Sequence, residues 1–305
     1  AQGVRRSTEE VACAVRADPV DGAAGAGCGV KPGLYPDMPA EQYHGIAAMS
    51  AGGLRRMRQS PAHFYGKQID PNRPESEPTP AMKAGTLFHV ALFEADKISE
   101  RYTVKPIGLS LATKEGKAWK ASQPEIVEII DADQLTKAQT QAERVRALPD
   151  VAALLQDGAP EASAFWIDEQ TGELCKCRPD WTSEAGEGVI LIDGKSCPDA
   201  SPDGFARTAW NMSYLHAAAW YVDGYEAATG RKVLGYVFAA VEHDWPHVAA
   251  SYMVPDDVLD LARAENRRLL DLYAECKRAG SWPGYAQGVQ LITLPAWAQR
   301  KLENA

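Results

Sequence analysis

The chain has 305 residues, of which 45% are hydrophobic and 24% are charged. This balance is ordinary for a soluble globular protein with a sizeable core, which needs no disulfide or metal staple to fold. No stretch approaches the roughly 18 consecutive apolar residues of a membrane span. The net charge of -9 weighs against a general nucleic-acid binder, although a binding channel is local and net charge does not exclude one.

The chain is predicted to hold one ordered domain after a flexible start. Residues 1–30 are rich in Ala and Gly and have little apolar periodicity, which predicts a flexible head or linker, and the domain is expected over residues 31–305. The sequence shows no signal-peptide pattern, so we expect a cytoplasmic protein. A Cys175-x-Cys177 pair without any C-x-x-C motif favours free thiols over a zinc site.

The first half of the chain reads as helices and loops. Ser50 is expected to cap a helix that ends before a Pro-started turn. Four prolines within residues 71–80 indicate a loop. The apolar spacing of residues 82–99 predicts a buried helix, the polar and basic residues 108–125 predict a mobile loop, and residues 131–150 predict a surface helix.

The second half mixes strands and helices. The first two strands are expected to form a hairpin through a Thr-Gly turn. The order of elements predicts an α/β (α+β) fold, with a central mixed β-sheet flanked by helices. Strands are predicted over residues 162–168, 174–181, 188–196, 232–243 and 247–255, and helices over residues 214–230 and 255–280.

Charged residues stand where two neighbouring predicted strands end. Asp180 follows Pro179, and Asp193 and Lys195 follow the apolar run 189–192. Residues i and i+2 of a strand project from the same face. If the two strands pair, both aspartates converge on one Mg²⁺, and Lys195 can orient or deprotonate a water or stabilise charge on a phosphate. The alternative is a hairpin-end turn beside a surface Asp–Lys pair.

Two more residues are candidates, each with a structural alternative. His89 lies inside the predicted helix 82–99, where it is either a satisfied core histidine or an imidazole that binds or orients groups at the metal. Tyr221 lies on the helix 214–230, where it is either a packed aromatic residue or a hydroxyl that faces the phosphate.

From about residue 33 onward, the chain resembles the C-terminal nuclease domain of exonuclease VIII, the RecE-type enzymes of prophage recombination systems. It is more distantly similar to RecB-type nuclease domains and lambda exonuclease, which share the PD-(D/E)XK core. The stretches that carry the resemblance keep the family's order along the chain: "EQYHG" (41–45), "GTLFHVALFEADKISERYTVKP" (85–106), "TGELCKCRPD" (171–180), "LIDGKS" (191–196), "YVDGYEAATG" (221–230) and "LPAWAQ" (294–299).

The resemblance implies a metal site and a catalytic lysine. Asp180 and Asp193 match the metal-binding carboxylates, and His89 matches a histidine near the metal. The backbone carbonyl of Gly194 is implied as a further ligand. Lys195 matches the catalytic lysine, and the implied cofactor is Mg²⁺, for which Mn²⁺ can substitute.

The resemblance also implies substrate contacts, with two departures. Tyr221 matches the tyrosine of a Q-x-x-x-Y helix, but the glutamine position holds Ala217, with His216 beside it as a DNA-binding candidate. Ser50 matches a serine near the DNA 5′ end in lambda-type relatives. The basic residue that follows this serine in close relatives is Ala51 here, and Arg55 and Arg56, a turn further on, are expected to contact DNA.

The function expected from the resemblance is a double-strand DNA exonuclease that runs 5′ to 3′ and leaves a 3′ single strand for a RecT-type annealing protein. The alternatives are a nuclease with a single-strand or structure-specific habit, and a non-catalytic module that binds DNA ends. The resemblance further implies a homotetrameric ring. Its channel is expected to collect Lys114, Lys117 and Lys120 from the basic loop, in a bacterial or phage-encoded protein.

Overall fold

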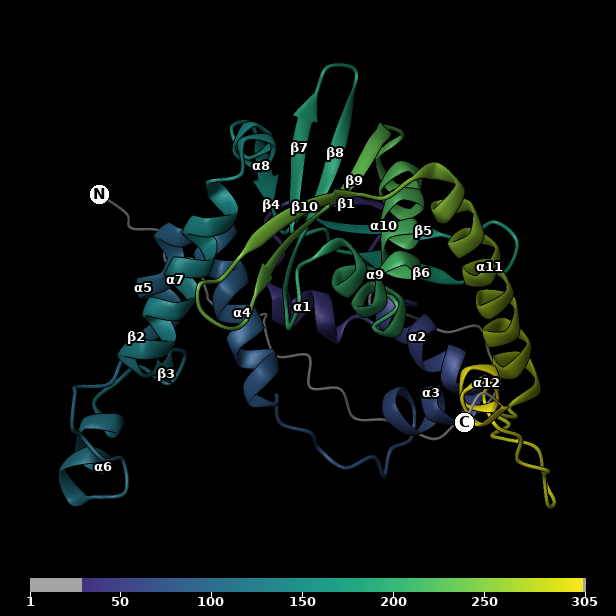
Figure 1. Cartoon of the computed structure of the whole chain (residues 1–305), viewed down its shortest axis with the longest axis horizontal. Coiled ribbons are helices and arrows are strands. Elements are labelled where there is room, and N and C mark those ends of the chain that lie inside the picture. The colour runs from purple at the N-terminus through teal and green to yellow at the C-terminus, as the bar shows by residue number, and fades with distance from the viewer. Residues whose placement is uncertain (1–28, 304–305) are drawn as a thin grey trace, which may run out of the picture.

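The central layer of the protein is a mixed β-sheet in the order β10-β9-β8-β7-β4 (Figure 1). The computed structural model describes residues 29–303, so the prediction for residues 1–30 lies almost wholly outside the described residues. Neighbours β8 and β9 run parallel and the other pairs antiparallel, which confirms the predicted mixed sheet. The strands are β4 (Gly158–Pro160), β7 (Trp181–Ala185), β8 (Gly188–Cys197), β9 (Lys232–Glu242) and β10 (Ala249–Met253).

A smaller antiparallel sheet, β1-β5-β6, lies beside the central one. Its strands β5 and β6 form the predicted hairpin, in which Gly172 adopts a φ of 73° and Asp168 Oδ1 accepts hydrogen bonds from Thr171. A separate pair, β2 and β3, is parallel. These strands are β1 (Gly33–Tyr35), β2 (Tyr102–Val104), β3 (Glu128–Ile130), β5 (Ser163–Ile167) and β6 (Leu174–Cys177).

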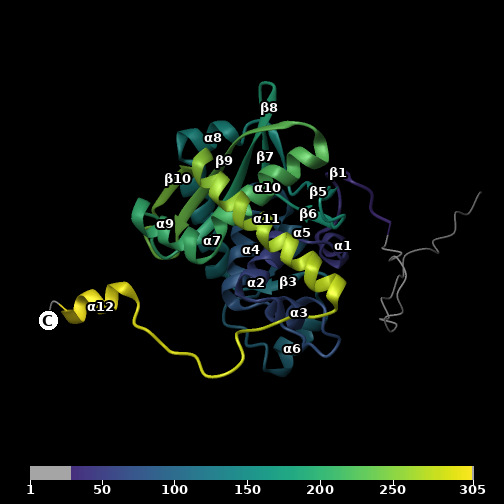
Figure 2. The same ribbon diagram turned by 90° about the vertical axis from the view of Figure 1, so that its right-hand side faces the viewer.

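Helices cover both faces of the central sheet. The α4 and α7 helices pack on one face against Ile192 and Ala239, and α9, α10 and α11 pack on the other against Leu191 and Phe238 (Figures 1 and 2). The helices are α1 (Ala40–Gly45), α2 (Ala51–Gln59), α3 (Pro61–Gln68), α4 (Pro80–Phe93), the 3-10 turn η1 (Ala95–Lys97), α5 (Ile98–Arg101), α6 (Lys114–Ala121), α7 (Ala132–Arg146), α8 (Pro149–Leu154), α9 (Pro202–Asn211), α10 (Tyr214–Thr229), α11 (Asp256–Ala279) and α12 (Ala296–Glu303).

Two predicted loops are wrong because they contain capped helices. The expected turn after Ser60 is α3, which Pro61 begins and which the Ser60 side chain caps by accepting a hydrogen bond from the His63 amide. The basic segment 108–125, expected to be a loop, contains α6, where Thr113 accepts from the Gly116 amide. In addition, α9 was not predicted. None of the described helices combines the length and apolarity needed to cross a bilayer.

The predicted strand over 174–181 divides into two strands that belong to different sheets. It ends as β6 at Cys177 and resumes as β7 at Trp181. Proline has no N–H to donate to a ladder, so Pro179 interrupts the pairing. The break places Asp180 at the junction between the two sheets.

Helix α10 lies close to the smaller sheet because it has a glycine at the contact. A Cβ added at Gly224 would lie 2.3 Å from the Trp166 ring of β5, and Trp166 also packs against Trp220, with ring centroids 4.9 Å apart. The contact therefore fixes α10 against the sheet junction at which the candidate site is built.

Gly224→Ala is expected to lower the free energy of unfolding by about 1–3 kcal/mol, because the new methyl group overpacks a rigid indole. The matched control is Gly66→Ala in α3, where an added Cβ meets nothing within 4 Å. There, helix propensity should raise stability by up to about 1 kcal/mol. Urea unfolding of both variants measures the effect. Equal stability of the two variants would contradict the proposed packing.

Candidate active site

The carboxylates of Asp180 and Asp193 meet at the junction of the two sheets. Trp181 of β7 pairs with Ile192 of β8, which places the preceding Asp180 next to Asp193. Asp180 Oδ2 accepts a hydrogen bond of 2.9 Å from the Gly194 amide, which fixes its side chain toward β8. Beyond the effect of burial, the charge of Asp193 acts on the Asp180 carboxyl group and raises its pKa. The convergence expected from strand pairing is therefore present.

Lys195 completes this group from the same face of β8. Its Nζ donates to Asp193 Oδ1 and, at 3.3 Å, to the Gly194 carbonyl. It also lies 5.1 Å from the centroid of the Tyr214 ring at the start of α10. Asp193 is buried, so the alternative of a surface Asp–Lys pair is wrong.

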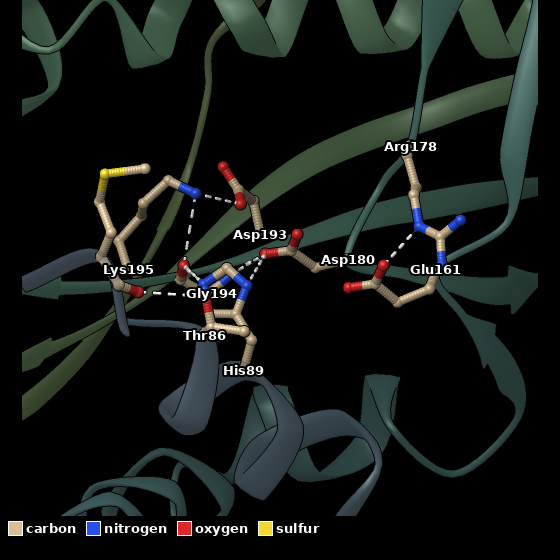
Figure 3. A network of polar contacts seen from close by, with 9 residues as sticks. Thr86, His89, Glu161, Arg178, Asp180, Asp193, Gly194 and Lys195 are labelled. Carbon is tan, nitrogen blue, oxygen red and sulfur yellow. Dashed lines mark hydrogen bonds and ion pairs between the residues drawn. The ribbon is translucent and has the colours of Figure 1, made fainter. Parts of the chain in front are cut away.

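Gly194 connects the acidic strand to the helix that carries His89. An added Cβ would lie 3.1–3.3 Å from Phe88, Leu92 and Phe93 of α4, so the absence of a side chain lets α4 approach the strand. The approach brings His89 Nε2 to 2.7 Å from the Gly194 carbonyl and His89 Nδ1 to 3.5 Å from Asp180 Oδ2 (Figure 3). His89 is thus directed into the polar cluster rather than into an apolar core.

The buried charges shift each other's protonation. Burial raises the pKa of Asp180 well above its usual range, and the charge of Asp193 raises it further. Burial also acts to raise the pKa of Asp193, but Lys195, Asp180 and His89 together outweigh it and hold that pKa low. Burial opposes the ammonium form of Lys195, yet the two carboxylates raise its pKa. Burial and Lys195 lower the pKa of His89, which favours the neutral imidazole that binds metals.

Sequence reasoning missed a third acidic residue, Glu161. A carboxylate oxygen of Glu161, a ring nitrogen of His89 and a carboxylate oxygen of Asp180 all lie within 4.8 Å of one another, so the three side chains could hold one metal ion. Glu161 has a φ of 56°, a left-handed conformation that is uncommon outside glycine, and its amide donates to the Asp180 carbonyl at 3.1 Å. No motif surrounds Glu161 in the sequence, so only the fold shows its position.

Arg178 holds Glu161 in place and links the cluster to the N-terminal segment. Its Nε donates to Glu161 Oε2 at 2.5 Å, and its Nη1 donates to the Met38 carbonyl and to Ser163 Oγ, each at 2.8 Å (Figure 3 shows the Glu161 pair). Two residues earlier, the buried Lys176 donates to the carbonyls of Tyr43 and Ile46 at 2.8 and 2.6 Å. Lys176 of β6 and Arg178, which directly follows this strand, therefore hold the segment that leads into α2.

Tyr221 and Ser50 are both engaged in the fold. Tyr221 is half-buried between two core clusters, where burial raises its pKa well above the usual range and nearby Tyr43 and Asp193 add to the shift. Ser50 Oγ accepts from the Gly53 amide at 3.2 Å and caps α2. The cap explains Ser50 without any DNA contact.

The predicted DNA-binding residues divide between two places. Arg55 is exposed and Arg56 half-buried on α2, and His216 lies on α10 with its ring 6.0 Å from that of Trp210. Lys114 and Lys117 are exposed on α6, which projects away from the central sheet in Figure 1. Within one chain, the α6 lysines do not join the acidic cluster.

The side chains present fit a divalent metal ion. Asp180, Asp193 and Glu161 offer carboxylate oxygens, Gly194 offers a carbonyl, and His89 offers a neutral imidazole. Hard oxygen donors with one imidazole suit Mg²⁺ or Mn²⁺. The raised pKa of Asp180 indicates that one ammonium does not offset the ionisation of both carboxyl groups, and a divalent cation would stabilise the form in which both are ionised.

The sequence profile of a family described as "PDDEXK-like domain of unknown function (DUF3799)" matches residues 50–295. The chain belongs to the DUF3799 family. Solved structures include an exonuclease candidate from Eubacterium rectale, similar at a TM-score of 0.59 and 13% identity over 87% of this chain and 98% of that one. Together with the family match, this shared fold confirms the predicted PD-(D/E)XK nuclease domain.

Two other solved structures match this DUF3799 chain at lower TM-scores. Protein SSO0001 has a TM-score of 0.27 and 13% identity, covering 45% of this chain and 67% of that one. Protein VC1899 from Vibrio cholerae has a TM-score of 0.21 and 11% identity, covering 76% and 57%. No curated protein matches the chain.

Asp180→Asn is expected to separate metal binding from folding. Without metal, the variant should be at least as stable as the wild type, because it removes like-charge repulsion with Asp193 and keeps an oxygen that can accept from the Gly194 amide. A divalent ion that binds only the folded state raises stability by about 2.7 kcal/mol at 100 times its Kd. Thermal unfolding in a Mn²⁺ titration should show this gain in the wild type and little of it in the variant.

The control for that titration is Glu187→Gln, an exposed acidic residue in the turn between β7 and β8. It should keep the full Mn²⁺-dependent gain of the wild type. An equal gain in Asp180→Asn would exclude Asp180 as a metal ligand.

Proposed function

We propose that this DUF3799 protein is a metal-dependent exodeoxyribonuclease that hydrolyses linear double-stranded DNA from 5′ to 3′ and leaves a 3′ single strand for recombination by strand annealing. The observation that supports it best is the group of buried Asp193 with half-buried Asp180 and Lys195, and with His89 against the Gly194 carbonyl. Polarity and end preference rest on the resemblance to exonuclease VIII.

The proposed reaction replaces one P–O ester bond of DNA by a P–O bond to water. Asp180, Asp193, His89 and the Gly194 carbonyl would hold Mg²⁺ or Mn²⁺, with Glu161 beside them. When bound, such an ion supplies Lewis acidity toward the phosphate and a more acidic water. The buried carboxylates orient these groups before the substrate arrives, so little reorganisation is needed during the reaction.

Lys195 acts in this proposal as a hydrogen-bond donor. Asp193 and Asp180 raise its pKa, which keeps the amine protonated at neutral pH. A protonated Nζ stabilises the negative charge that develops on the phosphate oxygens rather than removing a proton from water. The Tyr214 ring beneath Nζ limits where the ammonium can move.

An end-labelled duplex assay tests this function. Linear duplexes labelled at the 5′ or the 3′ end, and circular and single-stranded DNA, are incubated with Mg²⁺, with Mn²⁺ and with excess EDTA. We expect early release of 5′ label from linear duplex, no cutting of circles and no activity in EDTA. Lys195→Ala should lose at least about 100-fold in rate, the range of one transition-state donor, while it keeps the Mn²⁺-dependent thermal shift.

Other results of this assay would support one of the alternative functions instead. Cleavage of circles or of single strands would indicate a nuclease of different substrate habit. Binding to DNA ends without cleavage under any metal condition would indicate a non-catalytic module. Full activity in EDTA would overturn the metal mechanism.

We further propose that the protein assembles as a homotetrameric ring, acts with a RecT-type annealing protein, and works in a bacterial cytoplasm. Enclosure would keep an enzyme of net charge -9 on DNA, whereas phosphate contacts alone are salt-sensitive. Lys114, Lys117 and Lys120 of the projecting α6 are the proposed channel residues. Light scattering of the full chain should give four times the 33.1 kDa chain mass. A monomer that degrades long duplex without dissociating would contradict the ring.

A further inference from the structure

An exposed tryptophan stands beside the candidate active site. Trp210, near the end of α9, has 56% of its surface exposed, although the same helix buries Phe205 and Ala209. The guanidinium of Arg58 on α2 lies 4.8 Å from the Trp210 ring centroid. One side of the indole is thus supported by a cation, while more than half of the residue's surface faces solvent.

The pair is held in a fixed geometry. Arg58 Nη1 donates to Ser213 Oγ at 3.1 Å. Ser213 is buried and has a φ of 61°, a left-handed conformation that ends α9 and begins α10. His216, one turn further along α10, places its ring 6.0 Å from that of Trp210. These contacts make the Arg58–Trp210 pair a rigid surface rather than two mobile side chains.

The surrounding charge favours a nucleic acid. Arg55, Arg56 and Arg58 follow one another on α2, and none of the three makes an ion pair with a described residue, in contrast to Arg263 and Arg267 of α11. Arg58 interacts electrostatically with Glu265, but the Glu265 carboxylate already forms an ion pair with Arg268. Unpaired arginines around an exposed indole suit a phosphate chain with its bases unstacked.

The Arg58–Trp210 pair lies close to the catalytic lysine. Lys195 Nζ is 5.1 Å from the Tyr214 ring, Tyr214 follows Ser213 directly, and Ser213 is bonded to Arg58. Successive phosphates of one strand are about 3.4 Å apart along a duplex axis. A strand whose phosphate reaches Lys195 would therefore carry a base to Trp210 within a few nucleotides.

We propose that Trp210, supported by Arg58, stacks on an unpaired base of the DNA strand next to the bond to be cleaved. This inference rests on the proposed nuclease function and adds a substrate-positioning residue to it. Stacking tolerates every base, so Trp210 would hold a frayed end without sequence preference. Arg55 and Arg56 would contact the phosphates of the same strand.

The test uses the full chain with Ca²⁺ in place of Mg²⁺ and a duplex that has a short unpaired end. Trp210→Ala should weaken binding about 5- to 150-fold, the range of one base–aromatic stack. Trp210→Phe should stay within about threefold of the wild type, because a smaller ring still stacks. Near-ultraviolet crosslinking of a 5-iodouracil in the unpaired end should join that base to Trp210 of the wild type, a readout that needs no variant.

The matched control is Trp245→Ala. Trp245 is 74% exposed and has Arg144 5.8 Å from its ring, but Arg144 belongs to α7 on the opposite face of the sheet from α10. This variant should bind as the wild type does. Equal binding by the two alanine variants, or a crosslink that maps away from Trp210, would overturn the inference.

The two proposals fail in distinguishable ways. A wild type that cleaves DNA while Trp210→Ala binds normally overturns only the stacking role. A wild type that forms the Trp210 crosslink yet cleaves no DNA with Mg²⁺ or Mn²⁺ overturns only the nuclease function. A wild type that neither binds nor cleaves DNA overturns both.

Discussion

The repulsion between the carboxyl groups of buried Asp193 and half-buried Asp180 governs the arrangement of this protein around its candidate site. Removing a carboxylate from water is costly unless a partner compensates, and here two of them are placed together with one ammonium. Lys195 balances Asp193, and Asp180 is left with the Gly194 amide and a raised pKa. A site that is short of positive charge in this way is prepared for a divalent cation.

Several unusual features of the fold are accounted for by the need to hold that pair. Pro179 ends one sheet so that Asp180 can face the next strand, and Gly194 admits α4 with His89. Arg178 restrains Glu161, whose backbone is left-handed. Each of these three residues fixes the position of a polar or charged side chain of the site, namely Asp180, His89 or Glu161. Local strain of this kind is common where a binding site is preorganised.

The sequence was sufficient where chemistry follows strand geometry, and insufficient where it depends on packing. The i, i+2 spacing of Asp193 and Lys195 predicts that they share a strand face, and the contact between their side chains in the structure confirms it. Glu161 had no such signal, because only the meeting of two sheets brings it to Asp180. Ser50 matched a family position near DNA, and it also caps α2, as its place before the predicted helix indicated.

The errors in secondary structure have a related cause. Pro61 alone predicts a turn at α3, and polar composition alone predicts a loop at α6, whereas Ser60 and Thr113 are side-chain caps that mark helix starts. Trp210 and Arg58 are separated by more than 150 positions, and they meet only because α9 and α2 converge beside α10. No spacing rule within one element reports a contact of that kind.

Anomalous scattering from crystals grown with Mn²⁺ tests the central claim most directly. The account predicts a peak bounded by Asp180, Asp193, His89 and the Gly194 carbonyl, with Lys195 close by. Well-ordered crystals at saturating Mn²⁺ with no peak there, and with the Asp193–Lys195 pair undisturbed, would contradict it.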